Sequence, residues 1–283
     1  MKIIAAIPDM HTATRSIRGK GKRLGLVPTM GALHEGHLSL VRAARARCDV
    51  VAVSIFVNPT QFGPNEDFAK YPRSFERDRN LLAKEGVDFI FAPSAEEMYP
   101  AGATTWVTVE GMSDRLCGRS RPGHFRGVTT VVAKLFHIVE PDLAFFGQKD
   151  AAQAAIIRRM VRDLNLPVEI VVCPIVREPS GLAMSSRNAY LSAEQKQSAL
   201  VLYGSLKEIA RRFQSGERDT DRLIAAGKQI VAADSSVRLD YLEIVDPETL
   251  EPLSIVTPPA LVAVAAFVGS TRLIDNVVLE ISG

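Results

Sequence analysis

Two histidines three residues apart form the first group of side chains in this sequence that could do chemistry. His34 and His37 lie in the run Pro-Thr-Met-Gly-Ala-Leu-His-Glu-Gly-His, which follows a short apolar segment and begins a helical pattern. This spacing predicts that both imidazoles lie on the same side of the first helical turn. A helix N-terminus adds unpaired N–H groups and partial positive charge, which favour phosphate, and Gly36 removes a side chain where a nucleotide would approach. The alternative is that the histidines only cap a helix, but directly after the first predicted strand the pattern favours a nucleotide site.

Lysine, serine and arginine side chains in two later loops could bind the same phosphates. Lys149 lies in Gly-Gln-Lys-Asp, directly after a predicted strand, where a mobile ammonium group would reach phosphate oxygens. The alternative is a surface lysine at the start of a helix. Ser185, Ser186 and Arg187 offer two hydroxyls and a guanidinium fork, which suit the β- and γ-phosphates of a nucleotide. The alternative for this block is an ordinary interdomain loop.

The pattern of strands and helices that must position these loops is regular over the first two-thirds of the chain. Short β-branched runs alternate there with helical patterns, which is typical of βαβ units and of a parallel sheet covered on both faces. The predicted strands are 24–27, 50–57, 87–92, 142–146 and 168–173, and the predicted helices are 36–47, 74–85, 128–139 and 151–164. We therefore predict an α/β, Rossmann-like doubly wound domain, in which ligands bind at the carboxyl ends of the strands.

After Asn188 the pattern becomes two helices followed by three strands. Ser192, with Gln195 three residues on, predicts the start of a helix that runs to about Gln214. A second helix is predicted over 220–233, and strands over 239–245, 261–268 and 274–281. This order predicts a smaller α+β domain with an antiparallel sheet. We place the nucleotide- and substrate-binding domain at 1–183 and the C-terminal domain at 184–283.

The composition is that of an ordinary soluble globular protein. With 47% hydrophobic residues, 23% charged residues and a formal charge of +2, the chain lacks the concentrated basic face of a nucleic-acid binder. Only 15–23 is locally basic, and without interleaved aromatic residues it indicates a solvated helix end and loop. Three dispersed cysteines, Cys48, Cys117 and Cys173, favour a reduced intracellular protein over a disulfide scaffold or a zinc site. No segment predicts a membrane span or a secretory signal, so we expect a cytoplasmic location and neither a membrane nor a nucleic-acid partner.

Five blocks of the sequence resemble one enzyme family, in the same order. His-x-Gly-His alone resembles the signature of the nucleotidyltransferase superfamily, whose members transfer or activate groups through the α-phosphate of a nucleotide. The loop 56–62, the run 121–128, the loop 145–150 and the run 184–188 narrow this resemblance to the pantothenate synthetase (pantoate–β-alanine ligase) family. The resemblance extends over nearly the whole chain.

The resemblance implies a reaction in two steps. Pantoate attacks the α-phosphorus of ATP, releases pyrophosphate and leaves pantoyl-adenylate, and the amine of β-alanine then attacks the activated carbonyl to give pantothenate and AMP. No protein nucleophile is needed, so catalysis would depend on positioning and charge stabilisation. Mg²⁺ is expected on the phosphates, with no protein ligand assigned. A homodimer is also implied, and the C-terminal domain resembles a lid that would protect the adenylate from water.

The resemblance further implies which residues form the site. The catalytic residues are His34, His37 and Lys149. The ATP-binding residues are Met30, Gly31, Ala32, Leu33, His34, Glu35, Gly36, His37, Gly147, Gln148, Lys149, Asp150, Val176, Met184, Ser185, Ser186 and Arg187. Gln61 and Gln153 are expected to bind pantoate, and Gln61 also β-alanine, because amides both donate and accept without adding charge. Two positions depart from the family pattern, which often has Glu at Gln148 and Gln at Ala152.

Three other functions make different predictions. A cytidylyltransferase-like enzyme would keep the nucleotidyl group on its product, whereas the ligase releases AMP. A non-catalytic nucleotide-binding regulator would be expected to lack one of the charged site residues, but His34, His37, Lys149 and Arg187 are all present. An RNA-binding role would depend on 15–23 alone.

Overall fold

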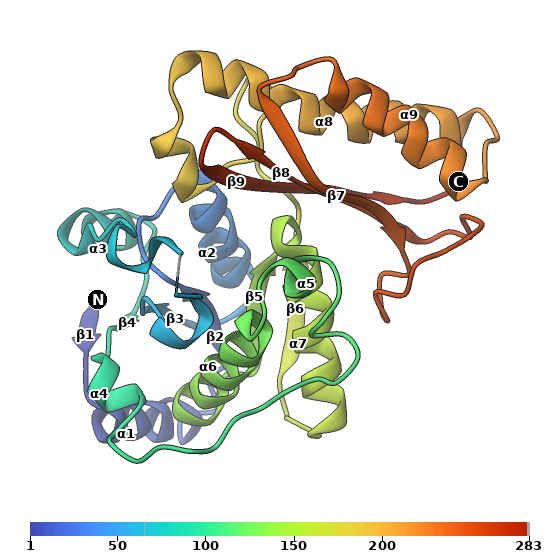
Figure 1. The fold of residues 1–283 in the computed structure, drawn as a ribbon. Coiled ribbons are helices and arrows are strands. Elements are labelled where there is room, and N and C mark those ends of the chain that lie inside the picture. The colour runs from blue at the N-terminus through green and yellow to red at the C-terminus, as the bar shows by residue number, and fades with distance from the viewer. Residues whose placement is uncertain (65, 282–283) are drawn as a thin grey trace. The chain divides into compact units, whose positions relative to one another are not determined.

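The structure consists of two compact units. A computed structural model describes residues 1–64 and 66–281, coloured along the chain in Figure 1. The first unit comprises Met1–Ser113, Arg121–Gly147 and Ile156–Pro174, and the second comprises Asp114–Ser120, Gln148–Ala155 and the chain from Ile175 onward. Two short segments from the first part of the sequence therefore belong to the second unit.

A parallel six-stranded sheet forms the centre of the first unit. Its strands are β1 (Lys2–Ile4), β2 (Leu24–Thr29), β3 (Val50–Ile55), β4 (Phe89–Phe91), β5 (Leu143–Gly147) and β6 (Glu169–Cys173). They lie in the order β1-β4-β3-β2-β5-β6, and every neighbouring pair is parallel. The predicted parallel sheet is confirmed, and the short edge strand β1 is an addition that the sequence pattern did not predict.

Helices cover both faces of this sheet. The helices are α1 (Ile7–Arg18), α2 (Glu35–Arg47), α3 (Phe75–Lys84), α4 (Ala95–Met98), α6 (His124–Val139) and α7 (Ala151–Asp163), with 3₁₀ turns η1 (Pro59–Gln61) and η2 (Asp67–Ala69). Leu38 and Val41 of α2 share one hydrophobic cluster with Val27 of β2, while the preceding strand residue, Leu26, is fully buried on the opposite face. Burial on both faces explains why the strand sequences are apolar throughout rather than alternating.

Strands β2 and β5 are neighbours at the centre of the sheet, and this pairing fixes where ligands can bind. From β2 the sheet extends through β3 to β4 on one side, and from β5 it extends to β6 on the other side. The strand order therefore reverses between β2 and β5, and in open α/β sheets ligands bind at such a switch point. The loops that follow β2 and β5 carry two of the three blocks that the sequence predicts to bind phosphate, and the third, 185–187, lies later in the chain.

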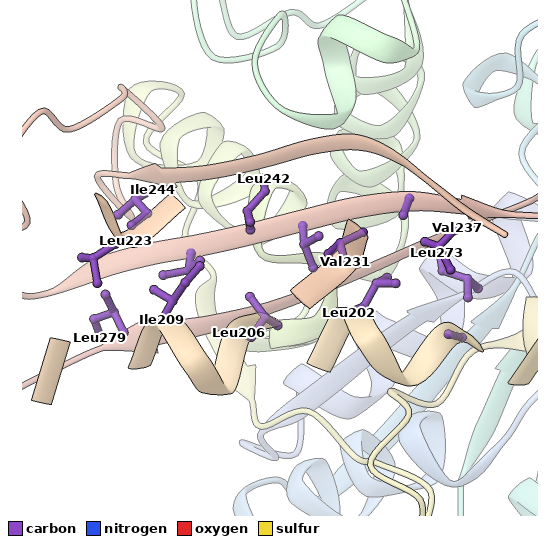
Figure 2. Close-up of a cluster of buried hydrophobic side chains, with 14 of the residues drawn as sticks. Leu202, Leu206, Ile209, Leu223, Val231, Val237, Leu242, Ile244, Leu273 and Leu279 are labelled. Atoms are coloured by element: carbon purple, nitrogen blue, oxygen red, sulfur yellow. The ribbon is translucent and has the colours of Figure 1, made fainter. Parts of the chain in front are cut away.

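The second unit has its own hydrophobic core. Its elements are α5 (Cys117–Ser120), η3 (Gln148–Asp150), η4 (Ser186–Tyr190), α8 (Ala193–Gln214), α9 (Thr220–Ala232), β7 (Val237–Val245), β8 (Ala260–Val268) and β9 (Thr271–Leu279). The strands form an antiparallel sheet in the order β7-β8-β9. Figure 2 shows leucine and isoleucine side chains of α8, such as Leu206 and Ile209, meeting Leu242 and Ile244 of β7. The predicted α+β arrangement is confirmed, and so is the capping box between Ser192 and Gln195 that begins α8.

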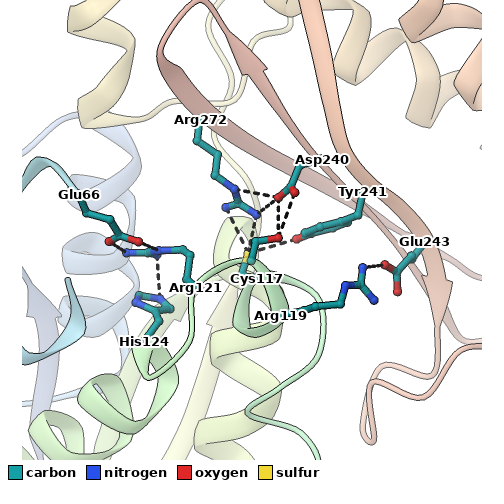
Figure 3. A network of polar contacts seen from close by, with 10 residues as sticks. Glu66, Cys117, Arg119, Arg121, His124, Asp240, Tyr241, Glu243 and Arg272 are labelled. Carbon is teal, nitrogen blue, oxygen red and sulfur yellow. Dashed lines mark hydrogen bonds and ion pairs between the residues drawn. The ribbon is translucent and has the colours of Figure 1, made fainter. Parts of the chain in front are cut away.

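Polar contacts attach the short segment 114–120 to the sheet of the second unit. The hydroxyl of Ser120 donates to Asp240 at 2.8 Å, and Arg119 forms an ion pair with Glu243. Arg272 donates to the same Asp240 at 2.7 Å, and the Sγ of Cys117 lies 3.1 Å from the hydroxyl of Tyr241 (Figure 3). Burial, with the neighbouring Cys117, raises the pKa of Tyr241. This network explains why the segment belongs to the second unit.

Some boundaries differ from those predicted. Helix α6 begins at His124 rather than at 128, because Gly123 takes a left-handed conformation that starts the helix one turn earlier. Helix α1 ends at Arg18, so the basic run 15–23 is a helix end and loop, as predicted. No helix in the described parts of the chain is long and apolar enough to cross a membrane.

Replacing Gly127 by alanine is expected to destabilise the first unit. A Cβ atom there would lie 2.6 Å from the carbonyl carbon of Thr60 and 2.7 Å from the Cα of Gln61, which are backbone atoms that cannot rotate away. We expect Gly127→Ala to lower the free energy of unfolding by about 1–3 kcal/mol. The matched control is Gly204→Ala in α8, where the nearest heavy atom is a side-chain methyl at 3.3 Å. The control should be neutral or stabilising by up to about 1 kcal/mol in urea titrations, and equal losses in both variants would contradict the explanation.

Candidate functional site

The two histidines of the first predicted loop pack against each other at the start of helix α2. Their ring centroids are 4.1 Å apart, which confirms that the imidazoles lie on the same side of the helix. His34 is the N-cap, and its side chain accepts from the N–H of Gly36 at 3.1 Å. The Nδ1 atom of His37 accepts in return from the N–H of His34 at 3.3 Å. Because both Nδ1 atoms accept, each neutral ring carries its proton on Nε2 and can donate only from that atom.

This capping arrangement corrects one expectation about the helix N-terminus. The sequence predicts unpaired N–H groups in the first turn, yet the N–H of Gly36 donates to His34 Nδ1 and the N–H of His37 donates to the carbonyl of His34 at 2.8 Å. Capping and a chemical role are therefore not exclusive for these histidines. The groups that this loop presents to an anion are the imidazoles and the helix dipole rather than a row of N–H groups.

A buried carboxylate holds the loop between β2 and α2. Asp78 of α3 is only 1% exposed, and its two oxygens accept from the N–H groups of Ala32 at 2.8 Å and Leu33 at 2.9 Å. Both Gly31 and Ala32 have positive φ angles, 82° and 51°, so the loop takes a conformation that needs support. A Cβ on Gly31 would lie 3.1 Å from an oxygen of Asp78. Asp78 is not predictable as a site residue, because a charged residue inside an otherwise amphipathic helical pattern gives no signal of burial.

Gln61 lies beside the start of the same loop. Its amide nitrogen is 3.0 Å from the sulfur of Met30, and its amide oxygen accepts from the side chain of Asn58 at 3.2 Å. Asn58 is buried and caps the 3₁₀ turn η1, so it fixes the turn on which Gln61 sits. The structure thus brings together Met30 and Gln61, which the sequence assigned to different substrates.

The run from Arg121 to His124 supports Gln61 from the other side. His124 Nδ1 donates to the backbone carbonyl of Gln61 at 2.8 Å, and Arg121 lies 3.0 Å from the other ring nitrogen (Figure 3). Arg121 also makes two hydrogen bonds with Glu66, at 2.7 and 2.5 Å. Burial raises the pKa of Glu66, but the hydrogen bond and charge of Arg121 outweigh it, so the pKa lies below its ordinary value. The sequence of this run resembles the family pattern but does not indicate what Arg121 and His124 contact.

In the second unit, an asparagine fixes the backbone that carries Lys149. Asn276 of β9 is 3% exposed and donates to the carbonyls of Gln148 at 2.9 Å and Lys149 at 3.0 Å. The side chain of Gln148 donates back to Asn276 at 3.0 Å. The side-chain amide of Gln148, where the family often has a carboxylate, therefore makes a hydrogen bond within the protein. Asp150 ends this turn, and Gln153 follows it on α7, half-buried.

The second predicted nucleotide block also depends on β9. The segment from Val176 to Met184 folds back on itself, with the N–H of Met184 donating to the carbonyl of Val176 at 3.0 Å. Arg177 within it makes a two-point ion pair with Asp275, at 2.6 and 2.9 Å, and stacks on the ring of Tyr203 at 3.7 Å. Asp275 is nearly fully buried. This contact fixes the turn to β9, and neither partner was predicted.

The remaining residues of that block form a 3₁₀ turn. Ser185 caps it, accepting from the N–H of Arg187 at 3.2 Å, and Ser186 is its first residue. The buried Asn188 donates to Glu178 at 2.9 Å and to the carbonyl of Ala183 at 3.1 Å, which holds the end of the turn. The predicted residues therefore fall into two groups, with 30–37, Gln61 and Gly147 in the first unit and the others in the second.

The role of Asp78 can be tested by its isosteric amide. Asp78→Asn keeps the shape but has only one oxygen, so one of the two loop N–H groups loses its acceptor. We expect the free energy of unfolding to fall by about 1–3 kcal/mol, with faster hydrogen exchange at Ala32 and Leu33. Asp163→Asn is the control, because Asp163 forms an exposed ion pair with Arg159 on the surface and its replacement should change stability by about 0.5 kcal/mol or less. Unchanged exchange at both loop amides in Asp78→Asn would contradict the role.

The ion pair between Glu66 and Arg121 predicts a pH dependence. Since the pKa of Glu66 is lowered in the folded protein, its stabilising effect is present above the ordinary glutamate pKa and is lost as the pH falls through the lower folded value. We expect Glu66→Gln to be less stable than wild type at pH 7 and the difference to shrink towards pH 3. Urea titrations at both pH values measure this, and a difference that stays constant or widens in acid would refute the assignment.

The sequence model of one protein family, pantoate-beta-alanine ligase, matches residues 2–278. The pantothenate synthetase of Acidobacterium capsulatum is 66% identical over 290 residues, covering 99% of this chain and 97% of that protein. That of Thermotoga petrophila is 60% identical, covering 99% of this chain and all of its own.

The comparison with solved structures indicates the same family. Pantothenate synthetase from Thermus thermophilus superposes with a TM-score of 0.94 at 47% identity, over 99% of this chain and 100% of that one. Pantoate-beta-alanine ligase from Francisella tularensis, solved in complex with "Beta-gamma ATP" and β-alanine, gives a TM-score of 0.81 at 35% identity, over 100% of this chain and 99% of that one. This chain belongs to the pantoate–β-alanine ligase family.

Proposed function

We propose that this protein is an ATP-dependent ligase that joins pantoate to β-alanine through a pantoyl-adenylate. Family membership supports the reaction, since relatives 60% identical or more are pantothenate synthetases. The Francisella tularensis enzyme, which binds an ATP compound and β-alanine, supports two of the three substrates. The observation in this structure that supports the proposal most is the pair of imidazoles 4.1 Å apart at the start of α2, directly after β2.

The chemistry needs no covalent bond to the protein. A carboxylate oxygen of pantoate attacks the α-phosphorus, the bond from that phosphorus to the β-phosphate oxygen breaks, and pyrophosphate leaves. The β-alanine nitrogen then attacks the acyl carbon, AMP leaves and the amine loses a proton. The protein has to align these groups and stabilise the negative charge that develops on phosphate oxygens.

In the first unit, the loop 30–37 is proposed to bind the ATP phosphates. His34 and His37 would donate from Nε2, the nitrogen that the capping geometry leaves protonated. The dipole of α2 adds positive potential at the same end of the helix. Gln61, held by Asn58 and His124, would bind pantoate and later β-alanine through its side-chain amide.

In the second unit, Lys149 is proposed to bind phosphate oxygens of the nucleotide. Gly147, the last residue of β5 in the first unit, is proposed to permit close approach of the backbone. Ser185, Ser186 and Arg187 are proposed ligands of the β- and γ-phosphates. The remaining ATP contacts are proposed for Gln148, Asp150, Val176 and Met184, and a pantoate contact for Gln153. Two contacts of β9 support these roles. Asn276 donates to the backbone carbonyl of Lys149, and Asp275 forms an ion pair with Arg177 in the segment that precedes Met184.

Mg²⁺ is proposed to accompany the nucleotide. Within residues 1–64 and 66–281, no three His, Cys, Asp or Glu side chains gather in a way that could hold a metal ion. We therefore propose a magnesium ion whose ligands are mostly phosphate oxygens and water, as is usual for nucleotide-bound Mg²⁺. When bound, the ion would neutralise charge on the leaving pyrophosphate.

The setting of the reaction is part of the same proposal. Three free, buried cysteines fit a reducing compartment, so the cytoplasm is the proposed location. A Rossmann-like domain at 1–183 and a C-terminal lid domain at 184–283 are proposed, and the separate hydrophobic core of the second unit, which also includes Leu182, supports a distinct C-terminal domain. A homodimer is the proposed assembly.

The reaction is tested by measuring pyrophosphate and AMP. With ATP, Mg²⁺ and pantoate alone, the protein should release pyrophosphate in an amount close to one per chain, and β-alanine should restore turnover and release AMP. A nucleotide retained on the product, or no pyrophosphate with pantoate, would contradict the proposal.

Single-turnover assays on His37→Ala and Lys149→Ala test the site. Each removes one donor to the developing charge, which should cost roughly 3 kcal/mol, or about a hundredfold in the adenylation rate. His137→Ala and Lys196→Ala are matched controls, because both side chains are exposed on helices and neither belongs to the predicted site residues. Normal adenylation with slow amide formation in the site variants would refute the assigned roles.

A further inference from the structure

A short hairpin of the second unit, residues 176–184, leads into the proposed phosphate ligands. Arg177 lies opposite Ala183 in an isolated antiparallel bridge. The N–H of Met184 donates to the carbonyl of Val176 at 3.0 Å, which closes the open end of the hairpin. The chain then enters the 3₁₀ turn η4 almost directly. The position of the hairpin 176–184 therefore determines where that turn begins.

One guanidinium group holds the hairpin 176–184 from three directions. The Nη1 atom of Arg177 donates to the carbonyl of Gly181 at 3.1 Å, across the turn. Both terminal nitrogens donate to the carboxylate of Asp275, at 2.6 and 2.9 Å, and the central carbon lies 3.7 Å from the centroid of the Tyr203 ring. Asp275 is 4% exposed, so its charge needs this partner. Because a bidentate pair is directional, it fixes the orientation of the hairpin on β9 as well as its position.

The next residue of β9 holds the other segment that is proposed to bind the nucleotide. Asn276 is 3% exposed and donates to the backbone carbonyls of Gln148 at 2.9 Å and Lys149 at 3.0 Å. Its own N–H donates to the carboxylate of Asp275 at 2.8 Å, which links the two positions. Because successive side chains of a strand point to opposite faces, β9 holds one nucleotide segment on each face.

We propose that Asp275 and Asn276 are positioning residues for ATP binding and adenylation, with different kinetic roles. Through Arg177, Asp275 positions the hairpin 176–184 and the phosphate ligands that follow it. Those groups contact ATP before and during the reaction, so their position sets the affinity for ATP. Asn276 positions the backbone of Lys149, whose ammonium group is proposed to act on the charge that develops in the transition state. Its position therefore sets the rate of adenylation. The inference rests on the proposed function.

Isosteric substitutions at the two adjacent positions separate these roles. Asp275→Asn removes the charge of the ion pair and one acceptor oxygen. We expect the Kd of a β,γ-methylene ATP analogue, measured by titration calorimetry, to rise about tenfold. The single-turnover rate of pyrophosphate release at saturating ATP should change by less than about twofold. Asn276→Asp turns the donor into an acceptor that faces two carbonyl oxygens. It should lower that rate about tenfold and change the Kd by less than about twofold.

Ser205→Ala is the matched control for a loss of stability alone. Ser205 is buried in α8 of the same unit, and its hydroxyl donates to the carbonyl of Leu202 in its own helix at 2.7 Å. We expect this variant to lose stability without a change in the Kd or in the rate. Asp275 and Asn276 are equally buried on one strand, so a merely structural role would change both constants in the same way in the two variants.

A double-mutant cycle tests the path from Asp275 to ATP. If Asp275 acts through Arg177, then Arg177→Gln should raise the Kd as much as Asp275→Asn does, and the double variant should bind no more weakly than either single variant. Should an isosteric variant not fold, Arg177→Gln and Asn276→Ala provide the same comparison.

Two kinds of failure can be told apart. An active wild type whose two single variants show the same kinetic change, or whose cycle is additive, would overturn this inference alone. A wild type that releases no pyrophosphate with ATP and pantoate would overturn the proposed function, and this inference with it.

Discussion

The loop after strand β2 adopts a backbone conformation that its own residues cannot stabilise, and a buried carboxylate from another helix stabilises it. Gly31 and Ala32 both have positive φ angles, and the N–H groups that follow would be unsatisfied inside the protein without Asp78. The position of His34 at the N-cap of α2 depends on where this loop ends. The geometry of both imidazoles therefore depends on one tertiary contact between residues 45 positions or more apart in the sequence.

The second unit uses the same principle with different residues. Two adjacent side chains of β9, Asp275 and Asn276, fix the two segments that the sequence predicts to bind nucleotide. Asp275 forms an ion pair with Arg177. The side chain of Asn276 accepts from the side chain of Gln148 and donates to the backbone carbonyl of Lys149. In both units, buried polar side chains with satisfied hydrogen bonds set the backbone of the loops that the sequence predicts to bind nucleotide. Such buried networks specify one conformation because every alternative leaves a polar group unpaired.

The sequence predicted the fold and the loops better than it predicted the side chains that hold those loops in place. The long apolar strands and the helices between them follow from periodicity, and Ser192 with Gln195 marks the start of α8 in the chain itself. Strand β1 has only three residues, Lys2–Ile4, which is too short for a periodic signal. The supporting residues Asp78, Asn276 and Arg177 look like ordinary polar residues of a helix, a strand and a turn. Their roles arise from contacts across 45 to 128 positions, which no local pattern contains.

The chain contains one tryptophan, Trp106, and it lies in the first unit. Its fluorescence therefore reports the surroundings of one segment, whereas far-ultraviolet circular dichroism is dominated by helices in both units, including the 22-residue α8 of the second. The two optical signals need not change together when the protein is denatured. If their transitions coincide, the units unfold as one cooperative body, and if they separate, a single free energy of unfolding does not describe the whole chain.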